Sequence, residues 1–136
     1  MFHRGQAEAL LRLRKVARDA MKSLAIFQPQ LTGSVLNGTA DSHSCITLVL
    51  FAETTEEVIL RLLELKIPWR EEASMLRYGN GSTQRRPRLS FVAGETAIEL
   101  LVLTPGERRN PPLDPADGRP LKGASLSRLD QLMAGD

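Results

Sequence analysis

The residues in this sequence that could do chemistry gather in one short stretch, from Gly33 to Thr47. Gly33 and Ser34 form a turn signal, and such a turn at a helix start can present backbone N–H groups and a hydroxyl to a phosphate. An ordinary strand-to-helix turn is the other interpretation of this pair. Cys45 could be a nucleophile, but its only nearby base is His43, and thiol–imidazole pairs are defined by spatial geometry rather than by nearness in sequence. We therefore expect Cys45 to be a small buried residue at a strand start.

The spacing within this stretch follows a known pattern. A Gly-Ser turn is followed four residues later by a second glycine, and then by a serine that opens an apolar strand. Six positions keep these offsets without a gap: Gly33, Ser34, Gly38, Ser44, Ile46 and Leu48. In this the chain resembles the DNA polymerase β-like nucleotidyltransferases. The resemblance is sharp over residues 31 to 51 and extends to 103, and it implies a minimal nucleotidyltransferase-like fold in which Gly33 and Ser34 bind the nucleotide.

The two aspartates that give this family its chemistry are absent. Their places are taken by Cys45 and Thr47. The family's reaction uses two Mg²⁺ ions, and aspartates two residues apart on a strand point to the same face and can hold both. A thiol is a soft ligand that suits Mg²⁺ poorly, and a threonine hydroxyl carries no charge. The sequence thus predicts the fold with a degenerate metal site, and it names no catalytic residue and no cofactor.

One carboxylate remains where the family has its third. Glu99 lies in a later apolar strand and is the natural candidate for this role, although it could also be a residue at the rim. Asp41 is a candidate substitute metal ligand, with Glu53 and Glu99 as candidate companions. Asp41 precedes the strand that begins near Cys45 and Glu53 follows it, so that about 20 Å separates them. We do not expect them to share a metal ion.

The missing aspartates point to a binding role rather than to catalysis. We expect a catalytically degenerate module that binds a nucleotide, an RNA or a protein partner. The alternative is an active Mg²⁺-dependent enzyme that transfers a nucleoside monophosphate from a triphosphate with displaced metal ligands, and a third candidate is a structural subunit. Small members of the resembled superfamily work with a separate helical protein, so the resemblance implies such a partner or a homo-oligomer.

The densest cluster of basic residues lies between positions 77 and 88. It comprises Arg77, Arg85, Arg86 and Arg88, is interrupted by no acidic residue and lies near Tyr78. A hairpin with these charges could contact RNA or nucleotide phosphates. Solvated charges on an edge strand, which prevent aggregation, are the other interpretation.

Composition excludes several other classes of protein. The chain has 136 residues, of which 42% are hydrophobic and 25% charged, as in an ordinary globular protein. No apolar run approaches the roughly 20 residues that span a bilayer, so no membrane association is expected. The single cysteine fits a reducing compartment, and we expect a cytoplasmic location. A net charge of +2 does not by itself indicate nucleic-acid binding.

The elements that must position these residues can be predicted from periodicity and turn signals. Helices are expected where apolar residues recur every three or four positions, and strands where apolar runs are short and bounded by turns. The expected helices are 6–25, 35–40, 55–67 and 124–134, and the expected strands are 30–32, 45–51, 70–78, 88–93 and 96–103. The last two strands flank the hairpin signal Gly94-Glu95.

This order of elements predicts an α/β (α+β) protein with a mixed sheet and helices packed on one side. We expect residues 45–51 to form a central strand with 96–103 beside it in the same sheet. At this length residues 1–136 should form a single domain. Within it, residues 104–123 read as an irregular proline-rich arm that leads to the last helix.

Overall fold

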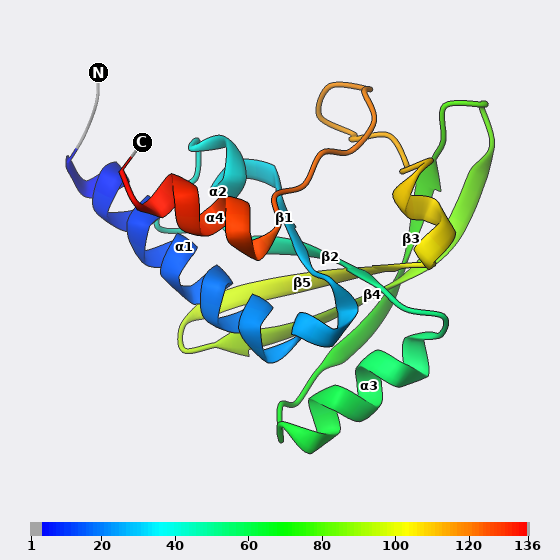
Figure 1. Ribbon diagram of the computed structural model, residues 1–136, viewed down its shortest axis with the longest axis horizontal. Coiled ribbons are helices and arrows are strands. Elements are labelled where there is room, and N and C mark those ends of the chain that lie inside the picture. Colours follow the sequence, from blue (N-terminus) through cyan, green and yellow to red (C-terminus); the bar gives the residue numbers. More distant parts are fainter. Residues whose placement is uncertain (1–3, 136) are drawn as a thin grey trace.

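The computed structural model describes residues 4–135 and contains one five-stranded mixed sheet (Figure 1). The spatial order of the strands is β1-β2-β5-β4-β3. β2 and β5 are parallel, and every other neighbouring pair is antiparallel. The strands are β1 (Gln30–Thr32), β2 (Ile46–Phe51), β3 (Arg70–Arg77), β4 (Thr83–Ala93) and β5 (Thr96–Leu103). The prediction of a mixed sheet with β2 and β5 side by side is confirmed.

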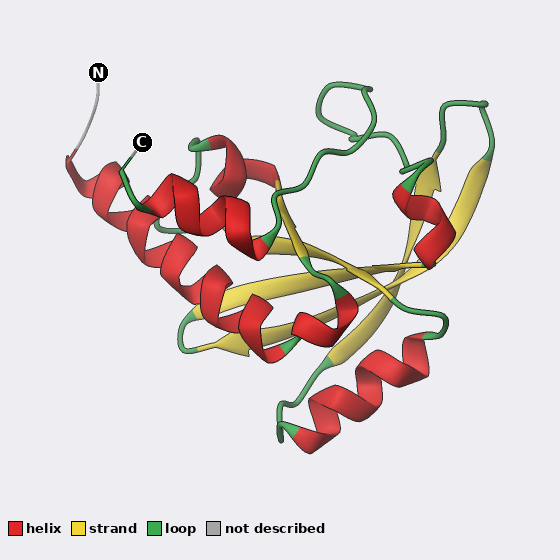
Figure 2. Ribbon diagram, viewed as in Figure 1, coloured by secondary structure: helices red, strands yellow, loops and turns green. Residues whose placement is uncertain are grey.

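The α-helices pack on one face of this sheet, as predicted (Figure 2). Alternate residues of β2 and β5, such as Leu48 and Leu100, point to this face and are fully buried. They belong to one buried core with Met21 from the first helix, Leu62 from the third and Leu129 from the last, each completely inaccessible. The helices are α1 (Arg4–Ser23), α2 (Gly33–Asn37), α3 (Thr55–Glu64) and α4 (Leu126–Met133), with 3-10 turns η1 (Ala25–Phe27) and η2 (Pro105–Arg108).

The segment after β5 covers part of the opposite face of the sheet. There a second, smaller apolar cluster joins Val49, Leu76, Leu101 and Leu103 of the strands to Leu121 of the segment that links β5 to α4. The guanidinium of Arg108 lies 4.3 Å from the centre of the Phe51 ring, a cation–π contact that holds η2 against β2. The remainder of this face, toward the start of β2, carries polar residues.

Some element boundaries differ from those predicted. β4 begins at Thr83 instead of residue 88, so that three of the four clustered arginines lie in one strand. The predicted short helix over 35–40 is found at Gly33–Asn37, because Gly38, at φ 86°, ends it in the left-handed region that glycine adopts readily. Thr54 caps α3, since its hydroxyl accepts a hydrogen bond from the N–H of Glu57 at 3.4 Å.

Within residues 4–135, no helix combines the length and the apolar character needed to cross a membrane.

Candidate functional site

The Gly33-Ser34 turn lies beside the start of β2. Thr32 of β1 is paired with Thr47 of β2, and the turn follows directly after Thr32. Gly33 has φ 78°, and no atom lies within 4 Å of a Cβ built on it. Glycine is therefore needed here for its backbone conformation and not for space. The carbonyl of Ser34 accepts hydrogen bonds from the N–H groups of the three residues that follow α2, which closes the turn tightly.

Helix α1 holds this turn from the other side. The Arg14 guanidinium donates to the carbonyl of Val35 at 3.0 Å and to that of Leu36 at 2.9 Å. These bonds satisfy carbonyls of a helix too short to be stable alone. Burial of the guanidinium lowers the pKa of Arg14 from its ordinary value. The turn is thus anchored to the helical layer while Gly33 and Ser34 stay partly accessible.

Thr47 and Glu99 lie directly opposite each other on the two parallel strands. Paired residues of adjacent strands point to the same side, which here is the face that the helices do not cover. Both side chains are half-buried. The fold therefore brings Glu99 next to one of the positions that hold an aspartate in the resembled family.

Cys45 does not occupy the place predicted for it. The expectation of a small buried residue at a strand start is wrong, because β2 begins at Ile46 and Cys45 is exposed. The preceding residues form a separate surface turn in which the Asp41 carboxylate accepts hydrogen bonds from the His43 N–H at 2.8 Å and the Ser44 hydroxyl at 3.4 Å. This turn carries the chain onto β2 from outside the core and leaves the thiol uncovered.

Arg88 neutralises the remaining carboxylate. Its Nη1 lies 2.9 Å from Oε1 of Glu99, and the two side chains are 29% and 33% exposed. The Arg88 Nε is buried and has no hydrogen-bond partner among the described residues. Arg88 therefore places a positive charge directly beside Glu99.

The side chains around Thr47 do not fit a pair of magnesium ions. Such ions need several carboxylate oxygens, whereas this site offers a neutral hydroxyl, an exposed thiol and one carboxylate already paired with Arg88. Within residues 4–135, no group of three His, Cys, Asp or Glu residues could hold a metal. Asp41 belongs to its own turn, and Glu53 is exposed past the far end of β2.

A second cluster, which the sequence analysis missed, lies further along the same face. Its centre is Glu107 of η2, whose side chain is only 11% exposed. Its carboxylate accepts hydrogen bonds from the Tyr78 hydroxyl, from Nε of Arg86 at 3.0 Å, and from both the N–H and the hydroxyl of Thr104 at 3.1 and 3.0 Å. The sequence Thr104-Pro-Gly-Glu107 has the spacing of a helix capping box, and that signal could have identified it.

This environment shifts the pKa of both acidic groups in the cluster. Burial and the hydrogen bond with Glu107 raise the pKa of Tyr78 to about 12. For Glu107, burial alone would raise the pKa, but hydrogen bonds from Tyr78, Thr104 and Arg86 outweigh it and hold the pKa below its ordinary value. The cluster therefore contains a charged carboxylate and a neutral phenol across the neutral range.

The fold divides the basic cluster. Arg86 and Arg88 point to the face opposite the helices and pair with Glu107 and Glu99. Arg85 and Arg77 belong to the opposite side of the β3–β4 ladder and are exposed. The four arginines therefore do not form one continuous basic surface, because neighbouring residues of a strand point to opposite faces.

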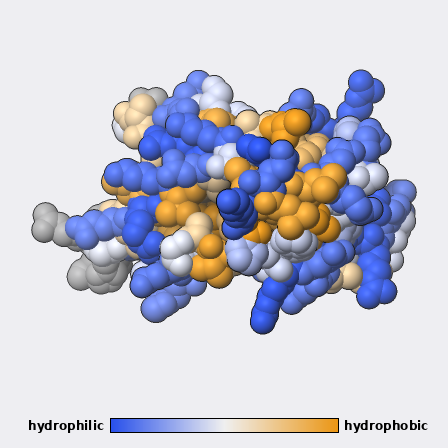
Figure 3. All heavy atoms as spheres, turned by 90° about the horizontal axis from the view of Figure 1, so that it is seen from below, coloured by the Kyte–Doolittle hydropathy of each residue, from blue (hydrophilic) through white to orange (hydrophobic). Residues whose placement is uncertain are grey.

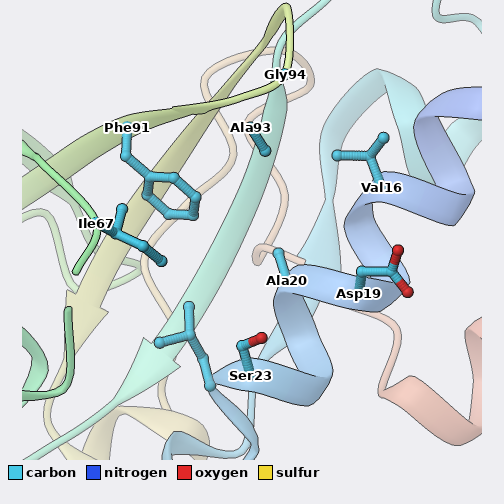
Figure 4. A pocket seen from close by; sticks show the side chains of 9 residues that line it. Val16, Asp19, Ala20, Ser23, Ile67, Phe91, Ala93 and Gly94 are labelled. Atoms are coloured by element: carbon cyan, nitrogen blue, oxygen red, sulfur yellow. The ribbon is translucent and has the colours of Figure 1, made fainter. Parts of the chain in front are cut away.

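The helical side of the molecule has an apolar groove of about 390 Å³ between α1 and the β4–β5 hairpin (Figure 4). Val16, Ala20, Ile67, Phe91 and Ala93 line it. Figure 3 shows apolar side chains gathered on this side between polar ones. The groove lies on the other side of the sheet from Thr47 and Glu99.

No family model and no curated protein matches this sequence. Among solved structures, the chain is similar to one from the GLD-2/RNP-8 complex, with 17% sequence identity and a TM-score of 0.41. The match covers 68% of this chain and 40% of that chain.

Proposed function

We propose that this protein binds the phosphates of a nucleotide without a metal ion and does not catalyse nucleotidyl transfer. The observation that carries the proposal is the Arg88–Glu99 pair opposite Thr47. Charge that Mg²⁺ would balance in the resembled family would here be balanced by a guanidinium. We expect no Mg²⁺-dependent transfer from ATP, GTP, CTP or UTP, because rates fall tenfold for each ~1.4 kcal/mol of lost transition-state stabilisation and a two-metal clamp supplies several times that.

Three groups would contact the ligand. Arg88 has five N–H donors, and Glu99 engages one of them. Gly33 and Ser34 would add backbone and hydroxyl donors from the turn beside Thr47, in the role that the resemblance implies. We favour a nucleotide over RNA because Arg86 is already engaged by Glu107, and Arg77 and Arg85 lie on the other face.

The experiment is a calorimetric titration with ATP, in EDTA and in Mg²⁺, on the wild type and three variants. Arg88→Gln should weaken binding in EDTA about tenfold, as expected for the loss of a charged hydrogen bond. Glu99→Gln should strengthen it, because the carboxylate competes with phosphate for the same guanidinium. Arg85→Gln is the matched control, from the same strand but the opposite face, and should change nothing.

The enzyme alternative predicts that Glu99→Gln is harmful, whereas the present proposal predicts that it strengthens ATP binding. If residual metal ligands support catalysis, labelled nucleotide is transferred in Mg²⁺ and Glu99→Gln abolishes transfer. That result would replace this proposal with an active enzyme. Absence of ATP binding in both EDTA and Mg²⁺ would reject the nucleotide and leave a structural role or protein binding.

A further inference from the structure

The two edge strands of the sheet differ in whether another segment of the chain pairs with their outer side. β1, at one edge, is covered by the segment before α4, since Leu31 and Ala124 exchange two backbone hydrogen bonds of 2.8 Å. Among residues 4–135, β3, at the other edge, pairs only with β4, and one backbone hydrogen bond reaches its outer side, from Leu113 to Arg77. An uncovered edge strand presents free N–H and C=O groups to any chain that can pair with them.

The backbone groups that point outward from β3 can be identified. The Tyr78 N–H donates to Ser82, across the hairpin, whereas the carbonyl of Arg77 accepts from Leu113, outside the sheet. Antiparallel pairing alternates along a strand, so that Glu71, Ala73 and Met75 also direct their backbone groups outward. Within residues 4–135, no hydrogen bond reaches these groups. All three residues are exposed, Met75 to 65%.

We propose that the β3 edge is a self-association surface on which β3 of a second copy pairs antiparallel, with the two-fold axis at Ala73. Glu71 then lies opposite the partner's Met75, and Ala73 lies opposite the partner's Ala73. About six backbone hydrogen bonds form, two for each hydrogen-bonded residue pair. The two sheets become one continuous sheet, with the helices of each copy left in place.

Leu113 selects this register. Sliding the second strand by two residues would place Glu71 directly opposite the partner's Arg77, but the carbonyl of Arg77 is already taken by Leu113. Sliding it the other way would place Glu72 opposite the partner's Glu72, which is repulsive. The free stretch from Glu71 to Met75 is symmetric about Ala73 and matches the proposed register.

The charges favour a second copy over another strand. In this register Glu71 lies diagonally across from the partner's Arg77 on the same face of the sheet, where the two charges attract. The two-fold axis generates a second, identical pair, so one strand sequence supplies both attractive contacts. Charged side chains on an edge normally discourage pairing. Here opposite charges at the two ends of β3 complement each other only when the strands run antiparallel, which rejects most other partners.

The test is the mass per particle in sedimentation equilibrium over a wide concentration range. The wild type should form a dimer. Glu71→Lys should raise the dimer dissociation constant about tenfold, since two attractive contacts become repulsive. Arg77→Glu should act similarly, and the double variant Glu71→Lys/Arg77→Glu should restore dimerisation because the charges are exchanged. Glu95→Lys, the same change at the β4–β5 turn, should have no effect.

A backbone variant gives an independent readout. Ala73→Pro removes one outward N–H group without removing a hydrogen bond to β4, and it should yield a folded monomer by circular dichroism. If it does not fold, the charge-exchange series decides alone. A wild type that stays monomeric at every concentration overturns the proposal, and so does a dimer insensitive to Glu71→Lys. Neither outcome bears on nucleotide binding, because these variants change β3 and the β4–β5 turn and leave Arg88 and Glu99 unchanged.

Discussion

Two glutamate–arginine pairs lie on the same face of the sheet and differ in what surrounds them. Arg86 and Arg88 are neighbours on β4 that point the same way, and each reaches one carboxylate. Glu107 is nearly buried and is bound by three residues, whereas Glu99 is one-third exposed and is bound only by Arg88 among the described residues. The Arg86–Glu107 pair therefore stabilises the fold, whereas the Arg88–Glu99 pair, of the same residue types, is an accessible charged site. The number of hydrogen bonds and the degree of burial make the difference.

The largest expected effect is on stability at the buried pair. Glu107→Ala should lower the free energy of unfolding by about 3 kcal/mol, because it leaves Arg86, Tyr78 and Thr104 without their common acceptor. Urea denaturation followed by circular dichroism measures this. A loss smaller than that of Glu99→Ala would show that burial does not distinguish the two pairs.

The second prediction concerns the titration of Tyr78, the only tyrosine in the chain. Its near-ultraviolet absorbance should titrate with a pKa of about 12, and Glu107→Gln should move the midpoint toward the ordinary value of about 10. Because the folded pKa is raised, the stabilisation is complete below about pH 10 and is lost as the pH rises through the folded pKa. An unshifted midpoint in the wild type would contradict the proposed environment of the phenol.

Glu107 should titrate in the opposite sense. Its folded pKa is lowered, so its contribution to stability is present above the unfolded pKa of about 4.3 and is lost as the pH falls through the folded pKa. Wild-type stability should therefore decrease in acid more steeply than that of Glu107→Gln. Parallel curves from urea denaturation across this range would contradict the assignment.

The fourth prediction is that added aspartates turn the accessible site into one that binds Mg²⁺. Cys45→Asp together with Thr47→Asp should raise Mg²⁺ affinity at least about tenfold in calorimetry, because Thr47→Asp puts a second carboxylate opposite Glu99 and Cys45→Asp adds a third two residues earlier in the chain. Thr47→Asp alone should give a smaller gain. No gain in the double variant would mean that Arg88 still excludes the metal, and adding Arg88→Gln would then be the decisive comparison.

The smallest effect should be on stability at the accessible pair. Glu99→Ala should cost no more than about 1 kcal/mol, since a partly exposed ion pair is screened by solvent. Thermal or urea unfolding beside Glu107→Ala tests both sites by one method. A cost comparable to that of Glu107→Ala would mean that Glu99 is a structural residue.

Local pattern was enough to predict the elements that matter most for the sheet. The apolar runs that became β2 and β5 and the turn at Gly33 were recognisable because strands and turns depend on residues close together in sequence. The helical stripe of α1 was recognisable for the same reason. It was also evident that Cys45 and Thr47 stand at the offsets from Gly33 where the resembled family has aspartates.

Tertiary structure decided which charges meet. The pairing of Thr47 with Glu99 depends on the register between β2 and β5, which are about 50 residues apart. Local sequence does not specify that register. In the sequence Arg86 and Arg88 belong to one basic cluster, whereas in the fold each of them pairs with an acidic residue from elsewhere in the chain. Sequence determines which side chains are available, but long-range packing determines their partners, because charge pairing depends on distance in space and not along the chain.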